Sequence, residues 1–217
     1  MRNPTTRRGL FAAGATLAVA GAGLAIAHRP ATESTIEPAA HYAPLTPCTT
    51  KKITPEQMEG PFYRPSSPQR IDLVESGISG ALLTLTGQVM TKDCRPVPGA
   101  LLDFWQADRH GDYDNGGYRL RGHQFADVDG CYRLQTIVPR SYDGTGGFRT
   151  PHIHLHVQRP GGKLLVTQLY FPGAIKAYGM DIDGTNKVDF LFDPELLVQL
   201  KAVEGNSFRA CFDFVIE

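Results

Sequence analysis

The sequence predicts an all-β protein, an antiparallel β-sandwich with long loops and one or two short helices. Two observations support this prediction. Short segments alternate apolar and polar side chains, which is the two-residue period of a β-strand. Turn-forming residues separate these segments, and the chain of 217 residues contains 23 glycines and 16 prolines. Short strands joined by turns in this way are typical of a β-sandwich.

The first predicted strands lie in the middle of the chain. Residues 83–89 alternate apolar and polar side chains, and residues 100–106 follow a turn rich in proline and glycine. We therefore expect these two segments to form an antiparallel pair. Residues 123–126 and 132–137 flank the sequence Asp-Val-Asp-Gly, which is typical of a tight turn.

The second half of the chain continues this pattern. Residues 152–158 and 164–171 flank a Pro-Gly-Gly turn, so they are expected to be neighbouring strands. Residues 208–216 form the last predicted strand and are expected to close the sheet. The only predicted helix covers residues 193–200, where Asp193 is placed to act as the N-cap and a proline follows in the first turn.

The strand at residues 152–158 is the most informative segment. Three histidines point to one face of it (His152, His154 and His156), and three aliphatic residues point to the other. Two histidines two positions apart on a strand place their imidazoles side by side, close enough to bind one metal ion. The alternative is an edge strand with a polar outer face. Three histidines in alternation, preceded by Arg149, favour a metal site over that alternative.

The composition limits the partners of the protein. Its 22 Lys and Arg residues balance 22 Asp and Glu residues, so the formal net charge is zero. A chain without net charge has no general attraction to nucleic acid or to an anionic membrane, and we expect neither partner. A length of 217 residues suits one sizeable domain.

The N-terminal segment has the pattern of an export signal. A pair of arginines precedes an uncharged stretch rich in alanine and glycine, which ends in Ala-Ile-Ala at residues 25–27. We expect a twin-arginine-type signal peptide over residues 1–27; the alternative is a membrane anchor, for which the stretch is short and weakly apolar. Cleavage would leave a periplasmic or extracellular protein without stable membrane association. Residues 28–52 are expected to form a linker or extended arm, and residues 53–217 the β-sandwich domain.

Four cysteines follow the predicted signal peptide: Cys48, Cys94, Cys131 and Cys211. An even number in an exported chain permits disulfides, with three possible pairings. Cys94 and Cys131 both lie at turns beside predicted strands, so the sequence weakly favours this pair. Free buried thiols are the alternative.

A metal held by two imidazoles needs further ligands from neighbouring loops. Carboxylates are available, and so are Tyr113 and Tyr142, each in a loop rich in glycine and aspartate. A trivalent cation would remove the phenol proton and bind the phenolate, and hard anionic oxygens together with imidazoles suit iron(III). Two histidines with a carboxylate would instead suit iron(II), and zinc also fits the histidine pair.

Several short motifs between Thr54 and Glu217 occur in the order and spacing of a known family. They include Gly60-Pro61-Phe62-Tyr63, Gly111-Asp112-Tyr113, Arg149-Thr150-Pro151-His152-Ile153-His154 and Thr167-Gln168-Leu169-Tyr170. In this combination the chain resembles the intradiol ring-cleavage dioxygenases, the family of catechol and protocatechuate 3,4-dioxygenases. The resemblance implies that residues 53–217 are a catalytic domain.

The resemblance also implies a metal site and a reaction. The family binds iron(III) through two tyrosines and two histidines, which match Tyr113, Tyr142, His152 and His154. Tyr142 matches the ligand that the substrate displaces, and Arg149 and Gln168 match residues that steady the substrate. The implied reaction uses O2 to cleave a catechol between its two hydroxyl groups, giving a muconate-type dicarboxylic acid. His156 has no ligand role in the family pattern.

Other functions stay open from the sequence. One alternative is a non-catalytic β-sandwich binding module that has lost the iron, against which the complete set of four ligands argues. Another is a zinc or copper protein built on the histidine pair. For the leading hypothesis the partners are a small aromatic diol and O2, and self-association into a homo-oligomer is compatible with the sequence.

Overall fold

The computed structural model describes residues 52–144, 147–171, 177–178 and 188–217. The predicted signal peptide, nearly all of the predicted arm and Cys48 lie outside the described residues. Within them almost all regular structure is β-strand, which confirms the all-β prediction. No helix in the described part of the chain is long and apolar enough to cross a membrane.

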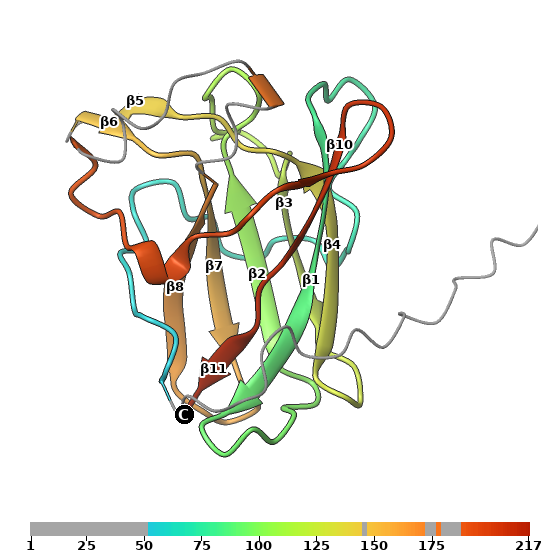
Figure 1. Cartoon of the computed structure of the whole chain (residues 1–217), viewed down its shortest axis with the longest axis vertical. Coiled ribbons are helices and arrows are strands. Elements are labelled where there is room, and N and C mark those ends of the chain that lie inside the picture. The colour runs from blue at the N-terminus through green and yellow to red at the C-terminus, as the bar shows by residue number, and fades with distance from the viewer. Residues whose placement is uncertain (1–51, 145–146, 172–176, 179–187) are drawn as a thin grey trace, which may run out of the picture. The chain divides into compact units, whose positions relative to one another are not determined.

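Two sheets and one small hairpin make up the fold (Figure 1). The first sheet contains β1 (Leu82–Thr91), β4 (Cys131–Ile137), β9 (Lys201–Ala202), β10 (Ser207–Cys211) and β11 (Phe214–Ile216). The second sheet has the order β3-β2-β7-β8 and contains β2 (Leu101–Gln106), β3 (Arg121–Phe125), β7 (His152–Gln158) and β8 (Leu164–Tyr170). The hairpin of β5 (Tyr142–Gly144) and β6 (Gly147–Arg149) leads directly into β7.

Strand β1 organises the first sheet because it has partners along both edges. Antiparallel β4 follows one edge, while β10 and β11 follow each other along the other edge, both parallel to β1. Between β10 and β11 the ladder is interrupted, and the side chain of Asp213 accepts the Gln88 N–H at 2.9 Å. The chain passes so close at this point that a Cβ atom on Gly87 would lie 1.8 Å from the Phe212 carbonyl oxygen. Only glycine fits there. The first sheet of the predicted sandwich is mixed, because β10 and β11 run parallel to β1.

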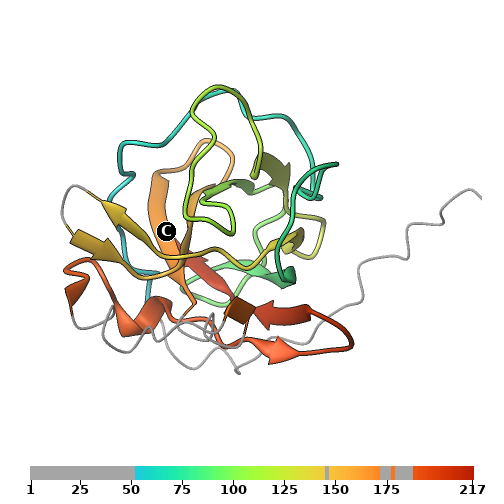
Figure 2. The ribbon, with the colours of Figure 1, turned by 90° about the horizontal axis from the view of Figure 1, so that it is seen from above.

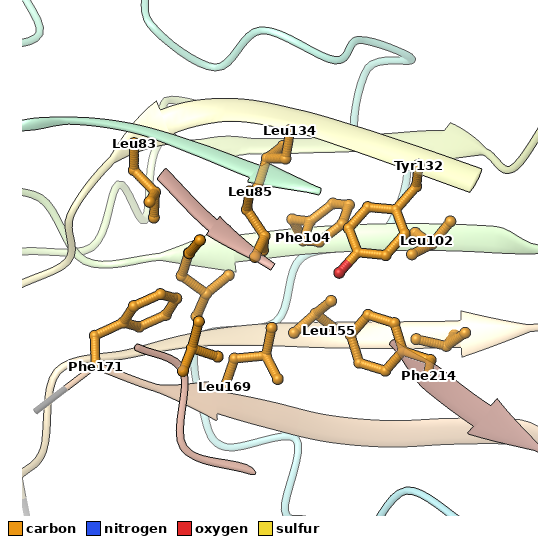
Figure 3. Close-up of a cluster of buried hydrophobic side chains, with 14 of the residues drawn as sticks. Leu83, Leu85, Leu102, Phe104, Tyr132, Leu134, Leu155, Leu169, Phe171 and Phe214 are labelled. Carbon is orange, nitrogen blue, oxygen red and sulfur yellow. The ribbon is translucent and has the colours of Figure 1, made fainter. Parts of the chain in front are cut away.

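The hydrophobic core lies between the two sheets, as Figure 3 shows. Leucines from β1 and β4 meet leucine and phenylalanine side chains from β2, β7 and β8. The fully buried members include Leu83, Leu85, Leu134, Leu102, Phe104, Leu155 and Leu169. Burying each such side chain contributes roughly 1.5–3 kcal/mol, so this apolar layer fixes the position of the sheet that carries the histidines.

The predicted pairing of neighbouring strands is correct in one case and wrong in another. β7 and β8 are antiparallel neighbours around the Pro-Gly-Gly turn, which confirms that prediction. β1 and β2, predicted as an antiparallel pair, lie in different sheets. β3 and β4 also separate after their turn, although Asp127 N–H donates to the Cys131 carbonyl as a tight turn requires. The connections cross from one sheet to the other because both sheets must contribute an apolar face to the same core.

The predicted helix at residues 193–200 is much shorter than expected. It is a single 3-10 turn, η1 (Pro194–Leu196), and the carboxylate of Asp193 caps it by accepting the Glu195 N–H at 2.9 Å. The predicted cap is therefore confirmed. The chain leaves the helix at Leu197, and Val198 N–H donates to the Tyr170 carbonyl at 2.8 Å. Pairing with the edge of β8 thus replaces further helical turns.

The favoured disulfide between Cys94 and Cys131 is wrong. Cys94 is disulfide-bonded, whereas Cys131 and Cys211 are free thiols. Cys131 lies opposite Gln88 on one side of β1 and Cys211 opposite Thr86 on the other side. Two free thiols on either side of an intervening strand are separated by about two strand spacings, roughly 9–10 Å, which exceeds the span of a disulfide.

Candidate metal centre

Strand β7 presents its histidines from the centre of a sheet, since it lies between β2 and β8. The edge-strand alternative is therefore wrong. The aliphatic residues of β7 point into the core and are fully buried, and the three histidines occupy the opposite face. His152 and His154 are each 1% exposed, and their Nε2 atoms lie 3.1 Å apart. Two imidazole nitrogens thus meet at one buried point.

Hydrogen bonding sets the tautomer of His152. Its Nδ1 lies 2.6 Å from the Thr150 carbonyl oxygen, so Nδ1 carries the proton and Nε2 offers a lone pair. Burial, together with the charge of Arg149, lowers the pKa of His152 to about 3. Burial likewise lowers the pKa of His154 well below its usual value. Both rings are therefore neutral at neutral pH, which is the protonation state that metal binding requires.

Packing fixes the ring of His154. It stacks on Trp105, with ring centroids 5.0 Å apart and an interplanar angle of 2°. On another side the chain at Gly60 comes so close that a Cβ atom there would lie 3.3 Å from His154 Cε1. Gly60 has a φ of +72°, a conformation that glycine adopts without strain. The motif Gly-Pro-Phe-Tyr thus begins with the one residue type that allows this close approach.

Both predicted tyrosines lie beside the histidine pair. Tyr113 Oη is 3.4 Å from His152 Nε2, and the Tyr113 ring stacks on Phe62 with centroids 4.3 Å apart. Tyr142, at the start of β5, meets Tyr113 edge to face at 5.5 Å and lies 5.7 Å from the His152 ring. The structure therefore brings together all four side chains that were predicted as metal ligands.

The chemistry of these side chains fits a trivalent cation. Among the described residues no group of three or more His, Cys, Asp or Glu side chains could hold a metal ion. The carboxylate of Asp114 instead accepts the backbone N–H groups of the loop after it, which lowers its pKa. Burial raises the pKa of Tyr113 well above its usual value. Only a strongly charged cation would convert such a phenol to a phenolate, and two phenolates with two imidazoles suit iron(III).

Arg149 lies at the edge of this group in a buried network. Its Nε donates to Asp189 Oδ1 at 2.9 Å and its Nη2 donates to Gln168 Oε1 at 2.7 Å. Gln168 in turn donates to the Met58 carbonyl oxygen at 2.9 Å. Arg149 also lies opposite Tyr142 in the β5–β6 hairpin. Arg149 is thus held beside Tyr142, and Gln168 lies opposite His154 in the sheet and holds Arg149. Asp189 was not predicted from the sequence.

On the tyrosine side the candidate centre borders a pocket of about 610 Å³, whose wall includes Tyr113 and Tyr142 but neither histidine of the pair. Aromatic side chains form part of its wall, namely Phe62, Tyr113, Tyr142 and Phe148. Its polar lining includes Asp112, Arg140 and Asp143. A space of this size accepts a ligand larger than a single aromatic ring.

His156 has a different environment from the other two histidines. Its Nε2 lies 2.9 Å from Glu59 Oε1, and its ring packs against Trp105 and Tyr63. In the sheet it lies opposite Asp103, whose carboxylate accepts the Ser67 hydroxyl at 2.7 Å. These contacts agree with the structural role predicted for His156.

The fold is thus a β-sandwich in which a buried histidine pair faces two tyrosines. A family model described as Dioxygenase matches residues 58–217, which is more than half of the chain. The chain belongs to the intradiol ring-cleavage dioxygenase family.

Individual relatives agree with this assignment. The dioxygenase domain of a dioxygenase and carbohydrate-binding protein fusion from Streptomyces sp. SirexAA-E is 46% identical, with a TM-score of 0.66 over 76% of this chain and 99% of that one. A catechol 1,2-dioxygenase from Pseudomonas sp. (strain EST1001) is 30% identical over 55% of this chain and 47% of its own. A hydroxyquinol 1,2-dioxygenase from Nocardioides simplex is 32% identical over 52% and 46%. The chain thus spans about half the length of these curated relatives.

Proposed function

We propose that this protein is an iron(III)-dependent dioxygenase that cleaves a catechol-type ring between its two hydroxyl groups with O2. The product would be a muconate-type dicarboxylic acid. The observation that carries this proposal is the meeting of Tyr113 Oη, His152 Nε2 and His154 Nε2 at one buried point, with Tyr142 alongside. Family membership and the catechol and hydroxyquinol dioxygenases among the relatives support the same chemistry.

Tyr113, Tyr142, His152 and His154 would hold the metal. Iron(III), when bound, would chelate the deprotonated diol and make its ring reactive towards O2. Two phenolates offset much of that charge, which lowers the cost of keeping the ion in a buried site. The neutral imidazoles add ligands without adding charge.

Tyr142 is the side chain that moves a proton. Both tyrosines line the open pocket, and the Tyr113 ring is also stacked on Phe62. Of the two, Tyr142 matches the ligand that the substrate displaces in the family. Burial raises the pKa of the Tyr142 phenol and the charge of Arg149 lowers it. Its phenolate oxygen is therefore a base strong enough to take a proton from an incoming hydroxyl group.

Arg149 and Gln168 orient the substrate. The guanidinium carries a fixed charge next to Tyr142, where it would stabilise the negative charge that develops on the substrate ring. Gln168 anchors one side of this guanidinium, and its own amide is tied to the Met58 carbonyl. Preorganised groups of this kind need not reorient during the reaction.

We further propose that the catalytic domain, residues 53–217, acts after export. A twin-arginine-type signal over residues 1–27 would carry the folded protein to the periplasm or the outside of the cell. Residues 28–52 would link this signal to the catalytic domain. Cell fractionation with N-terminal sequencing of the exported protein tests this. A mature chain that begins near His28 supports the proposal, and retention in the membrane fraction contradicts it.

The decisive experiment for the activity is oxygen consumption by iron-loaded protein with a panel of catechols. The expected result is uptake of O2 and a product whose mass equals substrate plus two oxygen atoms. Binding of iron by two tyrosinates should also colour the protein red through ligand-to-metal charge transfer. A colourless protein without oxygen uptake would indicate a binding module. A preference for zinc or copper in metal analysis would indicate a zinc or copper protein built on the histidine pair.

A further inference from the structure

The carboxylate of Asp189 is completely buried and is surrounded by donors. Its side chain has 0% exposure in the ion pair with Arg149. Oδ1 accepts Arg149 Nε at 2.9 Å and the Leu191 N–H at 3.1 Å, and Oδ2 accepts the Thr150 N–H at 2.8 Å. Both oxygens are thus engaged by protein groups. A carboxylate held in this way is a fixed point in the structure.

Asp189 comes from a segment distant in sequence that passes beside the hairpin of β5 and β6. In Figure 2 the chain from residue 188 towards η1 runs next to this hairpin, and the Arg149–Asp189 ion pair joins the two across 40 positions of sequence. The segment is also tied to β8, because Tyr170 donates its hydroxyl to the Leu191 carbonyl at 2.6 Å. The segment that carries Asp189 is therefore attached both to β6, through Arg149, and to β8, through Tyr170.

The guanidinium of Arg149 is fixed on two sides. Asp189 holds Nε and Gln168 holds Nη2, so the planar fork has one orientation. Arg149 also lies directly opposite Tyr142 in the hairpin of β5 and β6, so the guanidinium is fixed next to a predicted metal ligand. Without Asp189 one of the two anchors would be lost, and a buried cation would lack its counter-charge.

We propose that Asp189 is a positioning residue that sets the orientation of the Arg149 guanidinium towards the aromatic diol. This inference rests on the proposed function, since it assigns Asp189 a part in that reaction. Asp189 hydrogen bonds to Arg149, Thr150 and Leu191, none of which is a predicted metal ligand, and it is not part of the pocket wall, so it acts through Arg149.

The test compares Asp189→Asn with Asp193→Asn. Asparagine has the same shape but only one acceptor oxygen, so it cannot serve both Arg149 and Thr150. At Asp193 the same change keeps an N-cap, because asparagine and aspartate cap equally well. On iron-loaded protein Asp189→Asn should lower kcat about 10- to 100-fold, as a misplacement of about 1 Å does. KM and iron content should change little, and Asp193→Asn should retain full activity.

A double-variant comparison separates positioning from general stability. If Asp189 acts through Arg149, adding Asp189→Asn to Arg149→Met should cause no further loss of kcat. An equal further loss in the Arg149→Met background would overturn the proposal. If Asp189→Asn does not fold, the single variant Arg149→Met is compared instead with the double variant Arg149→Met, Asp189→Leu. Both proteins lack the arginine charge, so their kcat values are expected to be equal. A lower kcat in the double variant would overturn the proposal.

A crystal structure of Asp189→Asn gives a readout that does not need activity. The guanidinium of Arg149 is expected to turn, with loss of its contact to Gln168 or Tyr142. An unchanged guanidinium would overturn the inference. A wild-type protein that consumes no O2 with any catechol would overturn the proposed function instead, and the two failures are thereby distinguished.

Discussion

The Nε2 atoms of His152 and His154 lie 3.1 Å apart, although both side chains are almost completely buried. Nδ1 of the neutral His152 ring carries its proton and donates it to the Thr150 carbonyl oxygen, so Nε2 of His152 has none. A hydrogen bond between the two Nε2 atoms therefore needs the proton of His154 to be on its Nε2. That tautomer leaves His154 Nδ1 as a buried acceptor, and it has no hydrogen-bond partner in the described part of the chain. A cation at this point would replace the proton and let Nδ1 carry one instead.

This geometry predicts that His154→Ala and Tyr142→Phe abolish oxygen uptake with catechols. Changes to residues that merely support a ligand weaken metal binding about 10- to 100-fold, so loss of a ligand should exceed that. Iron content and oxygen uptake are measured on each purified variant. His156→Gln is the matched control, because it changes a histidine on the same face of the same strand and should keep its iron. Full iron and activity in His154→Ala would show that the ligand set is wrong.

Removal of the Arg149 charge should affect turnover rather than metal binding. Arg149→Met is expected to lower kcat about 100- to 1000-fold, the usual effect of losing one preorganised group at a developing negative charge. Iron should stay bound, because Arg149 supports the site from outside the four ligands. Iron analysis beside steady-state kinetics checks this, and a variant that loses its iron would contradict a substrate-steadying role.

Gly60→Ala should destabilise the protein through a specific clash with His154. Gly60 has a φ of +72° and its Cβ would lie 3.3 Å from His154 Cε1, whereas Gly161 has a φ of +68° with nothing within 4 Å. Both alanine variants carry the backbone strain, about 1 kcal/mol. Only Gly60→Ala should also weaken iron binding and shift the charge-transfer absorption. Thermal unfolding and iron titration of the two variants separate these effects; equal iron affinity would argue against the clash.

The buried histidines predict a pH dependence for the stability of iron-free protein. The pKa of His152 is about 3 when folded and about 6.5 when unfolded. The unfolded chain therefore binds more protons between these values, and the free energy of unfolding falls as the pH falls from 6.5 towards 3. The slope is about 1.4 kcal/mol per pH unit for each such histidine. Urea unfolding at pH 7 and pH 5 measures it. His152→Gln should have a smaller slope, and an identical slope would contradict the assignment.

Phe148 should influence the choice of substrate. Its side chain is 51% exposed and lines the pocket of about 610 Å³ beside Tyr142. We expect Phe148→Ala to raise KM about five- to tenfold for catechols with a bulky apolar substituent, since a half-buried phenyl contact contributes about 1 kcal/mol. KM for unsubstituted catechol should change less. Phe125→Ala removes an equally exposed phenylalanine outside the pocket lining and should change neither value.

Local patterns predicted the strands and the histidine face but not the pairing of strands. Alternation reports which residues share a face, and it located β1, β7 and β8 within a few residues of their observed bounds. It carries no information about which sheet a strand joins. β1 and β2 both have buried patterns, and only the shared core decides that they face each other.

The candidate site shows the same division. Tyr113, Tyr142 and the histidines stand in recognisable motifs, and the structure brings them together. Asp189 has no motif and no periodicity around it, so its contact with Arg149 follows only from the folded chain. The predicted disulfide between Cys94 and Cys131 was wrong because a position in a turn beside a strand does not tell which two cysteines meet in the folded chain.

The two parallel partners of β1 have a consequence for the order of events during folding. Residues 82–91 are made early, but the partners along one edge, β10 and β11, are separated from them by more than a hundred residues. A nascent chain that stops short of Ser207 presents this edge with unpaired N–H and C=O groups, which invite association with other chains. Closure of the first sheet must wait for the last segment to be synthesised, and contacts of such long sequence separation form slowly.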